Sequence, residues 1–286
     1  MNESKFFLYL YLALMITFSN SKINLGLYVL NKRSDGYHDI STVFYPIGWK
    51  DIIEIIPDES INNNIEIYNF GLSLNIPLQE NIIFKAYQLL LNRFNNLPGL
   101  KVYLYKQVPY GAGLGGGSAN AAFFLQTCNN LLKLNLTKEE LKEIASKLGA
   151  DCAFFMENKP CIASGKGDVL TPIELDLSSY YIYVVFPGIP ISTKEAYQNV
   201  VPQNREVDLQ RILQLPIEEW KYYLVNDFEN SIFNKYPVLS QLKQRMYDYG
   251  ALYGSMSGSG SAIYGIFKEK PLIEKNLELK YFIEKL

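Results

Sequence analysis

Alternation of apolar and polar positions predicts β-strands in the first part of the chain. In residues 22–29 every odd position from Ile23 onward is apolar, whereas Lys22, Asn24 and Gly26 share the opposite face. A lysine in such a position ordinarily faces solvent, and this is the default expectation for Lys22. Further strand-like segments, separated from the first by a turn at residues 34–36, are residues 42–47, 51–56 and 101–108.

Apolar residues spaced three or four apart predict three helices before residue 150. The first covers residues 81–94, and the second runs from the end of a glycine-rich segment to about residue 133. The third begins with a capping box formed by Thr137 and Glu140 and ends at Gly149. The next residues leave two roles open for Asp151, which is either the N-cap of a short helix over residues 152–156 or a functional carboxylate.

The second half of the chain mixes strands and helices without a strict β-α-β order. Residues 180–186 are continuously apolar and predict a buried strand, and a helix over residues 231–249 is predicted to be broken or kinked near Pro237. Two strands, residues 251–256 and 262–267, flank a second glycine-serine turn. This pattern predicts an α+β fold, and the length of 286 residues suggests two domains, residues 15–164 and 165–286.

The N-terminal residues need a separate interpretation. Residues 6–18 are apolar, but this stretch is shorter than the roughly 20 residues of a membrane-spanning helix. Lys5 before an apolar segment would suit a signal peptide, yet no clean small-x-small cleavage site follows. We favour the hypothesis that the native chain starts at Met15 and that residues 1–14 are a non-native leader.

Composition excludes several classes of function. A net charge of −2 provides no general attraction to nucleic acid or to an anionic membrane, so neither is expected as a partner. Cys128, Cys152 and Cys161 are odd in number and lack metal-ligand spacing, which predicts buried thiols in a reducing cytoplasm and no metal site. His38 is the only histidine, so a hydrolase triad would have to be built around it.

A glycine-rich segment between a strand and a helix predicts a phosphate site. Five of its first nine residues are glycine, which leaves backbone N–H groups accessible, and the following helix adds its positive end. No lysine follows as in a Walker A loop, and the Gly111, Gly113, Gly116 spacing lacks the β-α-β context of a dinucleotide site. A flexible linker is the remaining alternative. The segment comprises Pro109, Tyr110, Gly111, Ala112, Gly113, Leu114, Gly115, Gly116, Gly117, Ser118 and Ala119.

Four motifs in sequence order resemble those of the GHMP kinases, from about residue 15 to residue 267. They are Lys22-Ile-Asn24-Leu-Gly-Leu, the glycine segment, Gly149-Ala-Asp151 and Met256-Ser-Gly258-Ser-Gly260-Ser. The resemblance implies a two-domain α+β GHMP fold with the active site in the inter-domain cleft. It also implies an ATP-dependent small-molecule kinase, with ATP as co-substrate and Mg²⁺ as its companion ion.

The resemblance further implies roles for particular residues. Backbone N–H groups of residues 109–119 would bind the ATP phosphates, and Ser118 is a possible Mg²⁺ ligand. Asp151 would take the proton from the acceptor hydroxyl, and Lys22 would offset charge on the transferred group. Ala119 departs from the family pattern, which often has a second serine there.

Residues 32–38 followed by Thr42-Val-Phe44 resemble one branch of the family, whose substrate is a cytidine-diphosphate-linked polyol. Tyr37 and Tyr197 would stack on the two sides of cytosine, although Tyr197 could equally be a packed surface aromatic. His38 would hydrogen-bond the pyrimidine edge, and Asn24 would contact the diphosphate or the polyol. The alternatives are a mevalonate-type or homoserine-type kinase and a catalytically silent nucleotide-binding member. The sequence indicates no oligomeric state.

Overall fold

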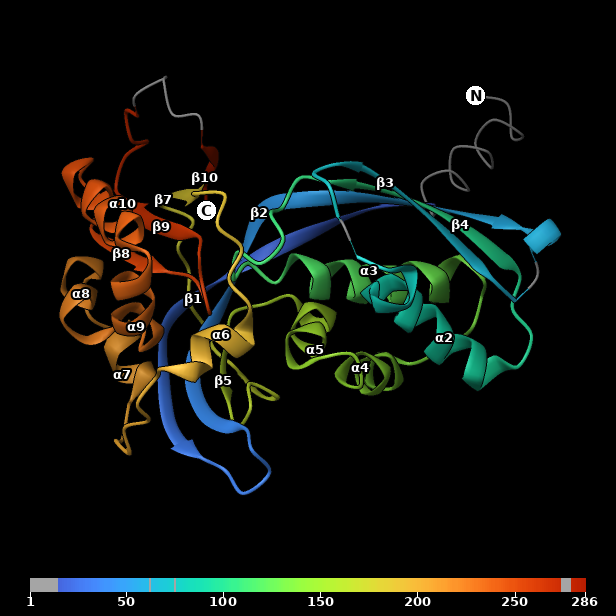
Figure 1. Cartoon of the computed structure of the whole chain (residues 1–286), viewed down its shortest axis with the longest axis horizontal. Helices are drawn as coiled ribbons and strands as arrows, with labels where there is room; N and C mark the ends of the chain where they lie inside the picture. The colour runs from blue at the N-terminus through green and yellow to red at the C-terminus, as the bar shows by residue number, and fades with distance from the viewer. Residues whose placement is uncertain (1–14, 62, 75, 274–278) are drawn as a thin grey trace. The chain divides into compact units, whose positions relative to one another are not determined.

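The computed structural model describes residues 15–61, 63–74, 76–273 and 279–286 (Figure 1), so the predicted leader lies outside the described residues. Two compact units share the chain, and each mixes helices with a sheet, as the sequence predicts. Unit 1 contains the strand residues before Lys22 together with Trp49–Val108 and Gly116–Asn158. Unit 2 contains Lys22–Gly48, Pro109–Gly115 and Lys159–Leu286. Each unit is therefore built from three separate stretches of the chain. The predicted division into two consecutive domains, with a boundary after residue 164, stays a prediction.

Two long strands explain why the units are discontinuous in sequence. β1 (Ile16–Lys32) and β2 (His38–Asp58) each contribute residues to both units, and the predicted turn at residues 34–36 joins them. The prediction of separate strands at residues 42–47 and 51–56 is wrong, because Gly48, Trp49 and Lys50 continue the extended backbone. Residues 48–50 include neither proline nor a residue with positive φ, and Pro46 just before them is itself part of the strand.

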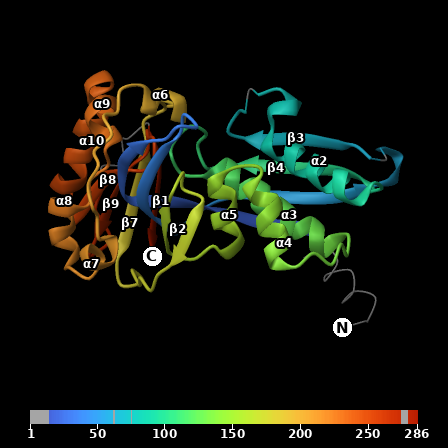
Figure 2. The same cartoon turned by 90° about the horizontal axis from the view of Figure 1, so that it is seen from below.

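The sheet of unit 1 is covered by helices on one face. β4 (Gly99–Lys106) pairs antiparallel with β2 and parallel with β3 (Ile65–Gly71). The helices on that face are α2 (Ile82–Phe94), α3 (Gly116–Leu131), α4 (Lys138–Ser146) and α5 (Ala150–Glu157). They lie together below the strands in Figure 1, and Figure 2 shows them from that side. Short 3-10 turns are η1 (Glu59–Ile61) and η2 (Leu78–Glu80).

Local sequence signals set the ends of these helices. Asn81 caps α2 by accepting a hydrogen bond from the N–H of Ile83 (2.9 Å). Thr137 and Glu140 form the predicted capping box of α4. The predicted end at Gly149 is wrong, since α4 ends at Ser146 and Gly149 instead serves as the N-cap of α5.

Unit 2 has its own sheet, with strand order β10-β7-β9-β8. The strands are β7 (Tyr181–Phe186), β8 (Tyr253–Met256), β9 (Ile263–Phe267) and β10 (Lys280–Lys285), and a hairpin of β5 (Cys161–Ser164) and β6 (Val169–Pro172) pairs with β2. The helices are α6 (Thr193–Gln198), α7 (Leu209–Leu213), α8 (Trp220–Tyr223), α9 (Phe228–Lys235) and α10 (Pro237–Asp248), with a 3-10 turn η3 (Ile217–Glu219). Pro237 at the first position of α10 separates it from α9, as predicted.

A buried carboxylate fixes the end of β4, from which the glycine segment departs. Asp51 on β2 has no exposed surface and forms an ion pair with Lys106, which is 2% exposed. The carboxylate also accepts hydrogen bonds from the backbone N–H groups of Gln107 (2.7 Å) and Val108 (2.8 Å). The side chain of Asn120 on α3 donates a fourth hydrogen bond (2.9 Å). One side chain therefore joins β2, the end of β4 and α3.

Burial makes this ion pair costly to break. Removal from water lowers the pKa of Lys106, and the neighbouring Asp51 charge opposes that shift. We expect Asp51→Asn to lower the free energy of unfolding by about 3–5 kcal/mol, because a buried ammonium loses its counter-charge while the side chain keeps its shape. Urea denaturation measures this loss.

Two variants serve as controls for that measurement. Glu143→Gln removes an exposed ion pair with Lys147 and should cost less than about 1 kcal/mol. The double variant Asp51→Asn with Lys106→Met should recover part of the lost stability, because no unpaired charge is left behind. A change below 1 kcal/mol for Asp51→Asn alone would contradict the prediction.

Candidate active site

The glycine segment has its carbonyl groups fixed by unit 2. The carbonyl of Gly111 accepts a hydrogen bond from the N–H of Ile191 (2.9 Å), and that of Ala112 accepts one from Ala262 (3.1 Å). The carbonyl of Gly113 accepts from the hydroxyl of Ser257 (2.9 Å). The N–H of Lys22 donates to the carbonyl of the next residue, Leu114 (3.0 Å). The carbonyls of residues 111–114 are therefore all hydrogen-bonded to other segments of unit 2, to which these residues also belong.

The N–H groups of the same residues have a different environment. Among the described residues, the N–H groups of residues 111–115 meet no hydrogen-bond acceptor. The chain then enters α3 at Gly116, where the first-turn N–H groups lack partners within the helix. N–H groups in front of a helix N-terminus are suited to binding an anion, and the binding of ATP phosphates at this loop stays a prediction. Ala119 is fully buried, so it offers no side-chain surface to a ligand.

Gly113 shows why this loop requires glycine. Its φ is +75°, and a Cβ atom there would lie 1.9 Å from the carbonyl oxygen of Ser257. No other residue fits without displacing backbone. Ser257 belongs to the second glycine-serine turn, and its hydroxyl also accepts a hydrogen bond from the N–H of Asn24 (3.3 Å). The sequence motif included Ser257, but its role as a support of the first loop was missed.

Lys22 is buried, which corrects the default expectation of a solvent-facing lysine. It is 3% exposed, donates a hydrogen bond from Nζ to Oδ1 of Asn24, and lies 4.6 Å from the ring centroid of Phe44. Asn24 is 2% exposed and also donates to the hydroxyl of Thr42 (3.0 Å). The Asn24 side chain thus orients the Lys22 ammonium, and its predicted contact with substrate stays a prediction.

Asp151 lies in the first turn of α5 in unit 1. The prediction that it caps this helix is wrong, because Gly149 is the N-cap and Ala150 is the first helical residue. A negative carboxylate in this position is favoured by the helix dipole. Ser118 lies in the first turn of α3, and burial raises the pKa of the Cys152 thiol on α5 to about 12.

The residues predicted to bind cytosine lie in unit 2. His38 begins β2, and its ring stacks on that of Tyr197 from α6 with centroids 4.8 Å apart and planes 20° apart. Tyr197 also makes an edge contact with Phe228. Tyr37 is 61% exposed, and the Lys166 ammonium lies 4.9 Å from its ring centroid. His38 and Tyr197 are therefore brought together, while Lys166 is a neighbour of Tyr37 that the sequence did not indicate.

Burial lowers the pKa of His38, and the nearby charge of Lys32 lowers it further. The imidazole is therefore neutral near pH 7 and has one donor and one acceptor nitrogen. A neutral imidazole can both donate to and accept from the edge of a base.

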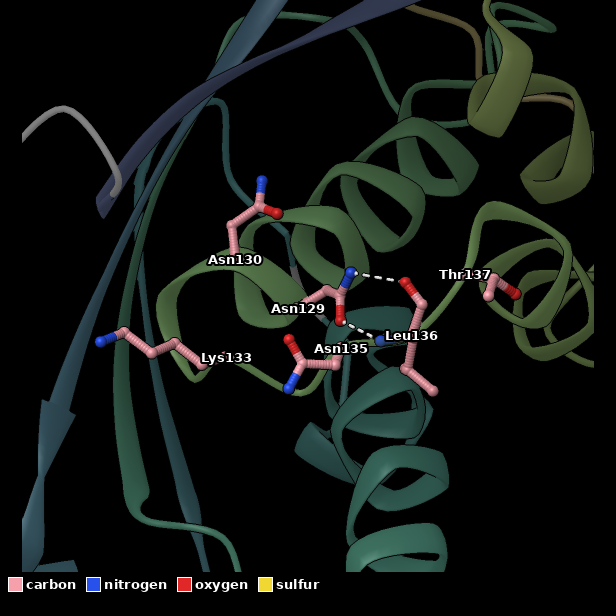
Figure 3. A pocket seen from close by; sticks show the side chains of 6 residues that line it. All are labelled: Asn129, Asn130, Lys133, Asn135, Leu136 and Thr137. Carbon is pink, nitrogen blue, oxygen red and sulfur yellow. Dashed lines mark hydrogen bonds between the residues drawn. The ribbon is translucent and has the colours of Figure 1, made fainter.

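The described surface also has a hollow that is separate from the predicted site residues. A surface hollow of about 540 Å³ in unit 1 contains none of the predicted site residues (Figure 3). There the Asn129 amide donates to the carbonyl of Leu136 (3.0 Å) and accepts from its N–H (2.9 Å), so it holds a loop in place. Lys133 points away from that amide in Figure 3.

Residues 15–61, 63–74, 76–273 and 279–286 contain neither a metal-ligand cluster nor a membrane-spanning helix. No cluster of three or more His, Cys, Asp or Glu side chains could hold a metal ion there. No helix in these ranges combines the length and apolar character needed to cross a membrane. The three cysteines, Cys128, Cys152 and Cys161, are buried free thiols, as the sequence predicts.

Comparison with known proteins identifies the family. The pattern of the GHMP kinases N terminal domain matches residues 81–159, and that of the GHMP kinases C terminal domain matches residues 210–277. A 4-diphosphocytidyl-2-C-methyl-D-erythritol kinase of Azobacteroides pseudotrichonymphae is 46% identical, with 94% of this chain and 100% of the relative covered.

Solved structures agree with this relationship. A crystal structure of 4-(cytidine 5'-diphospho)-2C-methyl-D-erythritol kinase has a TM-score of 0.73 and 31% identity, covering 88% of this chain and 90% of that one. The mevalonate kinase of Methanococcus jannaschii has a TM-score of 0.68 but only 13% identity, covering 95% and 98% of the two chains, so it supports the fold alone. The chain has the two-domain α+β fold of an ATP-dependent small-molecule kinase, and it belongs to the GHMP kinases, in the family of 4-diphosphocytidyl-2-C-methyl-D-erythritol kinases.

Proposed function

We propose that this kinase transfers the γ-phosphate of ATP to the 2-hydroxyl of 4-diphosphocytidyl-2-C-methyl-D-erythritol, giving the 2-phosphate and ADP in the non-mevalonate route to isoprenoid precursors. One observation carries the kinase chemistry. Four consecutive carbonyls of the glycine loop are paired within unit 2, and the donor to the last of them is the main-chain N–H of the buried Lys22. The backbone proposed to bind phosphate is therefore hydrogen-bonded to the backbone of Lys22, and Asn24 fixes the ammonium of the same residue.

The loop residues would bind ATP mainly through the main chain. Ala112 and Leu114 are each 1% exposed, so their side chains pack inward, and the partly exposed glycines at positions 111, 113 and 115 would present the backbone to ATP. Mg²⁺ is a proposed companion of ATP, because this ion binds substrate phosphates and usually needs only one or two protein ligands. The hydroxyl of Ser118 is the candidate protein oxygen.

Asp151 and Lys22 have separate proposed roles. Asp151 accepts the proton of the substrate 2-hydroxyl as that oxygen attacks the γ-phosphorus. Lys22 offsets negative charge on the group being transferred, and Asn24 keeps the Lys22 ammonium in one orientation. Phosphoryl transfer depends mostly on position and electrostatics, so a fixed cation and a base are sufficient protein chemistry.

The cytidine end of the substrate is assigned to Tyr37, His38 and Tyr197. Neutral His38 suits a hydrogen bond to the pyrimidine, and its stacked partner Tyr197 holds the imidazole plane. The exposed ring of Tyr37 is available to stack on the base once Lys166 moves aside. A mevalonate-type or homoserine-type kinase has no cytidine in its substrate and would not need these three side chains. The buried free thiols support a cytoplasmic location.

The first test removes the charges of the Asp151 carboxylate and the Lys22 ammonium. We expect Asp151→Asn to lower kcat by about 10²–10⁴-fold and Lys22→Met to lower it by about 10²–10³-fold. Release of ADP in the presence of Mg-ATP and the cytidine-diphosphate substrate measures both. Methionine keeps the contact with Phe44, so a melting curve can verify that the Lys22 variant folds.

Matched surface changes control for this experiment. Asp176→Asn and Lys221→Met alter the same residue types at exposed positions and should leave kcat unchanged. Turnover within tenfold of wild type for both Asp151→Asn and Lys22→Met would refute the assigned roles. Turnover of mevalonate, homoserine or galactose in place of the cytidine-diphosphate substrate would refute the assigned specificity.

The second test concerns the loop backbone. Gly113→Ala places a methyl group against the carbonyl of Ser257, so the loop must shift and its N–H groups lose their alignment. We expect KM for ATP to rise by about tenfold or more, the loss of roughly one good hydrogen bond to a charged group. Gly250→Ala is the control, since Gly250 also has positive φ (+90°) but nothing lies within 4 Å. Equal effects of the two variants would mean that backbone strain, not the clash, explains the change.

The third test uses the pH dependence of substrate binding. Burial lowers the pKa of His38, so this imidazole gains its proton at a more acidic pH than an ordinary histidine does. We therefore expect kcat/KM for the cytidine-diphosphate substrate to fall on the acidic side. His38→Phe keeps the ring stack on Tyr197 but should raise KM about tenfold and abolish that acidic limb. An unchanged KM in this variant would remove His38 from the substrate site.

A further inference from the structure

A buried asparagine just before α9 holds the second glycine-serine turn in unit 2. Asn226 is 4% exposed, and its side-chain oxygen accepts a hydrogen bond from the N–H of Phe228 (3.0 Å), two residues along the chain. Its side-chain nitrogen donates to the carbonyls of Met256 (2.8 Å) and Gly258 (2.8 Å). Both hydrogens of the amide are therefore used on the turn, and its oxygen is used locally.

The two carbonyls bound by Asn226 belong to the residues on either side of Ser257. Ser257 has no exposed surface, and its hydroxyl donates to the carbonyl of Gly113 (2.9 Å) in the first glycine loop. The same hydroxyl accepts a hydrogen bond from the N–H of Asn24 (3.3 Å) on β1. Asn226 is thus connected through one residue, Ser257, to both the glycine loop and β1.

Glu229, in the first turn of α9, holds the strand that leads into the turn. It is 9% exposed, and its carboxylate accepts hydrogen bonds from the N–H of Met256 (2.9 Å) and the hydroxyl of Ser255 (3.2 Å). Lys243 of α10 forms an ion pair with the other carboxylate oxygen (2.6 Å). Glu229 therefore fixes the end of β8, while Asn226 fixes the residues of the turn that follow it.

The backbone on both sides of Asn226 is itself joined to β1. The N–H of Leu27 donates to the carbonyl of Val225 (2.8 Å), and the N–H of Asp227 donates to the carbonyl of Leu27 (2.9 Å). The carboxylate of Asp227 also accepts a hydrogen bond from the N–H of Val29 (2.8 Å). The Asn226 side chain therefore reaches the turn from a backbone that β1 holds in place.

We propose that Asn226 is a positioning residue for ATP binding, which sets the second turn and, through Ser257, the first glycine loop. The inference rests on the proposed function, in which that loop binds the ATP phosphates. An amide suits this place because its nitrogen supplies two donors for two carbonyls. An aspartate of the same shape would present an oxygen to both carbonyls and leave them buried without a donor.

The expected effect is on nucleotide affinity more than on the acceptor. Backbone N–H groups bind an anion well when they are already aligned, because ordering them during binding costs free energy. The carbonyl of Gly113 is held by Ser257, and its φ of +75° belongs to a conformation that glycine can easily leave. A displaced Ser257 would therefore let the loop sample other conformations and weaken its hold on phosphate.

Isothermal titration calorimetry with Mg²⁺ and a non-hydrolysable ATP analogue tests the proposal without any acceptor. We expect Asn226→Asp to raise the Kd of the analogue by about tenfold or more, the loss of roughly one hydrogen bond to a charged group. The KM for the cytidine-diphosphate substrate should stay unchanged. Asn226→Ser is a second variant in case the first does not fold, since serine can keep the local contact with Phe228 but is too short to hold both carbonyls.

Asn129→Asp is the matched control. Asn129 also donates from its side chain to a backbone carbonyl, that of Leu136 (3.0 Å), but this bond holds a loop of unit 1. The control variant should have a lower melting temperature and an unchanged Kd for the analogue. An equal rise of Kd in Asn129→Asp and Asn226→Asp would show a general loss of stability and overturn the proposal.

A double-mutant cycle tests the route through Ser257. Ser257→Ala alone should also raise the Kd of the analogue, because it removes the hydroxyl bound to Gly113. Combined with Asn226→Asp it should add little to the larger single effect, since both changes break the same connection. Effects that multiply in the double variant would contradict the proposed route.

The same titration separates this inference from the proposed function. Wild-type affinity in both Asn226 variants, together with weakened binding in Gly113→Ala, would overturn the role of Asn226 and leave the loop as the ATP site. Absence of analogue binding to the wild-type chain would overturn the proposed function and, with it, this inference.

Discussion

The buried carboxylate of Asp51 is the interaction on which the position of the glycine loop depends. It neutralises Lys106 and accepts the N–H groups of the next two residues, so the chain leaves β4 in one direction. Its bond to Asn120 ties the helix that follows the loop to the same point. Because an uncompensated charge at this depth is costly, the stem of the loop and the start of α3 are held together.

The loop itself follows a second constraint, the pairing of its carbonyls. The carbonyls of residues 111–114 are paired with other parts of unit 2, and in the described residues no main-chain bond donated by the N–H groups of residues 111–115 accompanies them. Unpaired amides are costly in isolation but become useful where an anion binds. Glycine at position 113 allows the close approach to Ser257 that produces this arrangement. The second glycine-serine turn is therefore a structural support for the first.

Local sequence signals predicted much of the fold. The capping box at Thr137, the cap at Asn81 and the break at Pro237 each act within a few residues, so they could be located without the structure. β3 and β10 were missed, since β3 has only one buried residue and β10 has none, and neither strand shows clear alternation. Asp151 was not identified as lying inside α5, because its neighbour Gly149 caps that helix without a side chain.

The sequence by itself determined the family, the glycine-rich loop and the identity of the chemical groups. Motif spacing is a property of the chain, and glycine content controls backbone access at each position. Only the tertiary structure decided that Lys22 is buried, that Asn24 orients it, and that Tyr197 stacks on His38. It also decided that Asp51, one acidic residue among 29 acidic side chains, holds the loop. Burial and pairing depend on which distant residues surround a side chain, and that information arises only when the chain folds.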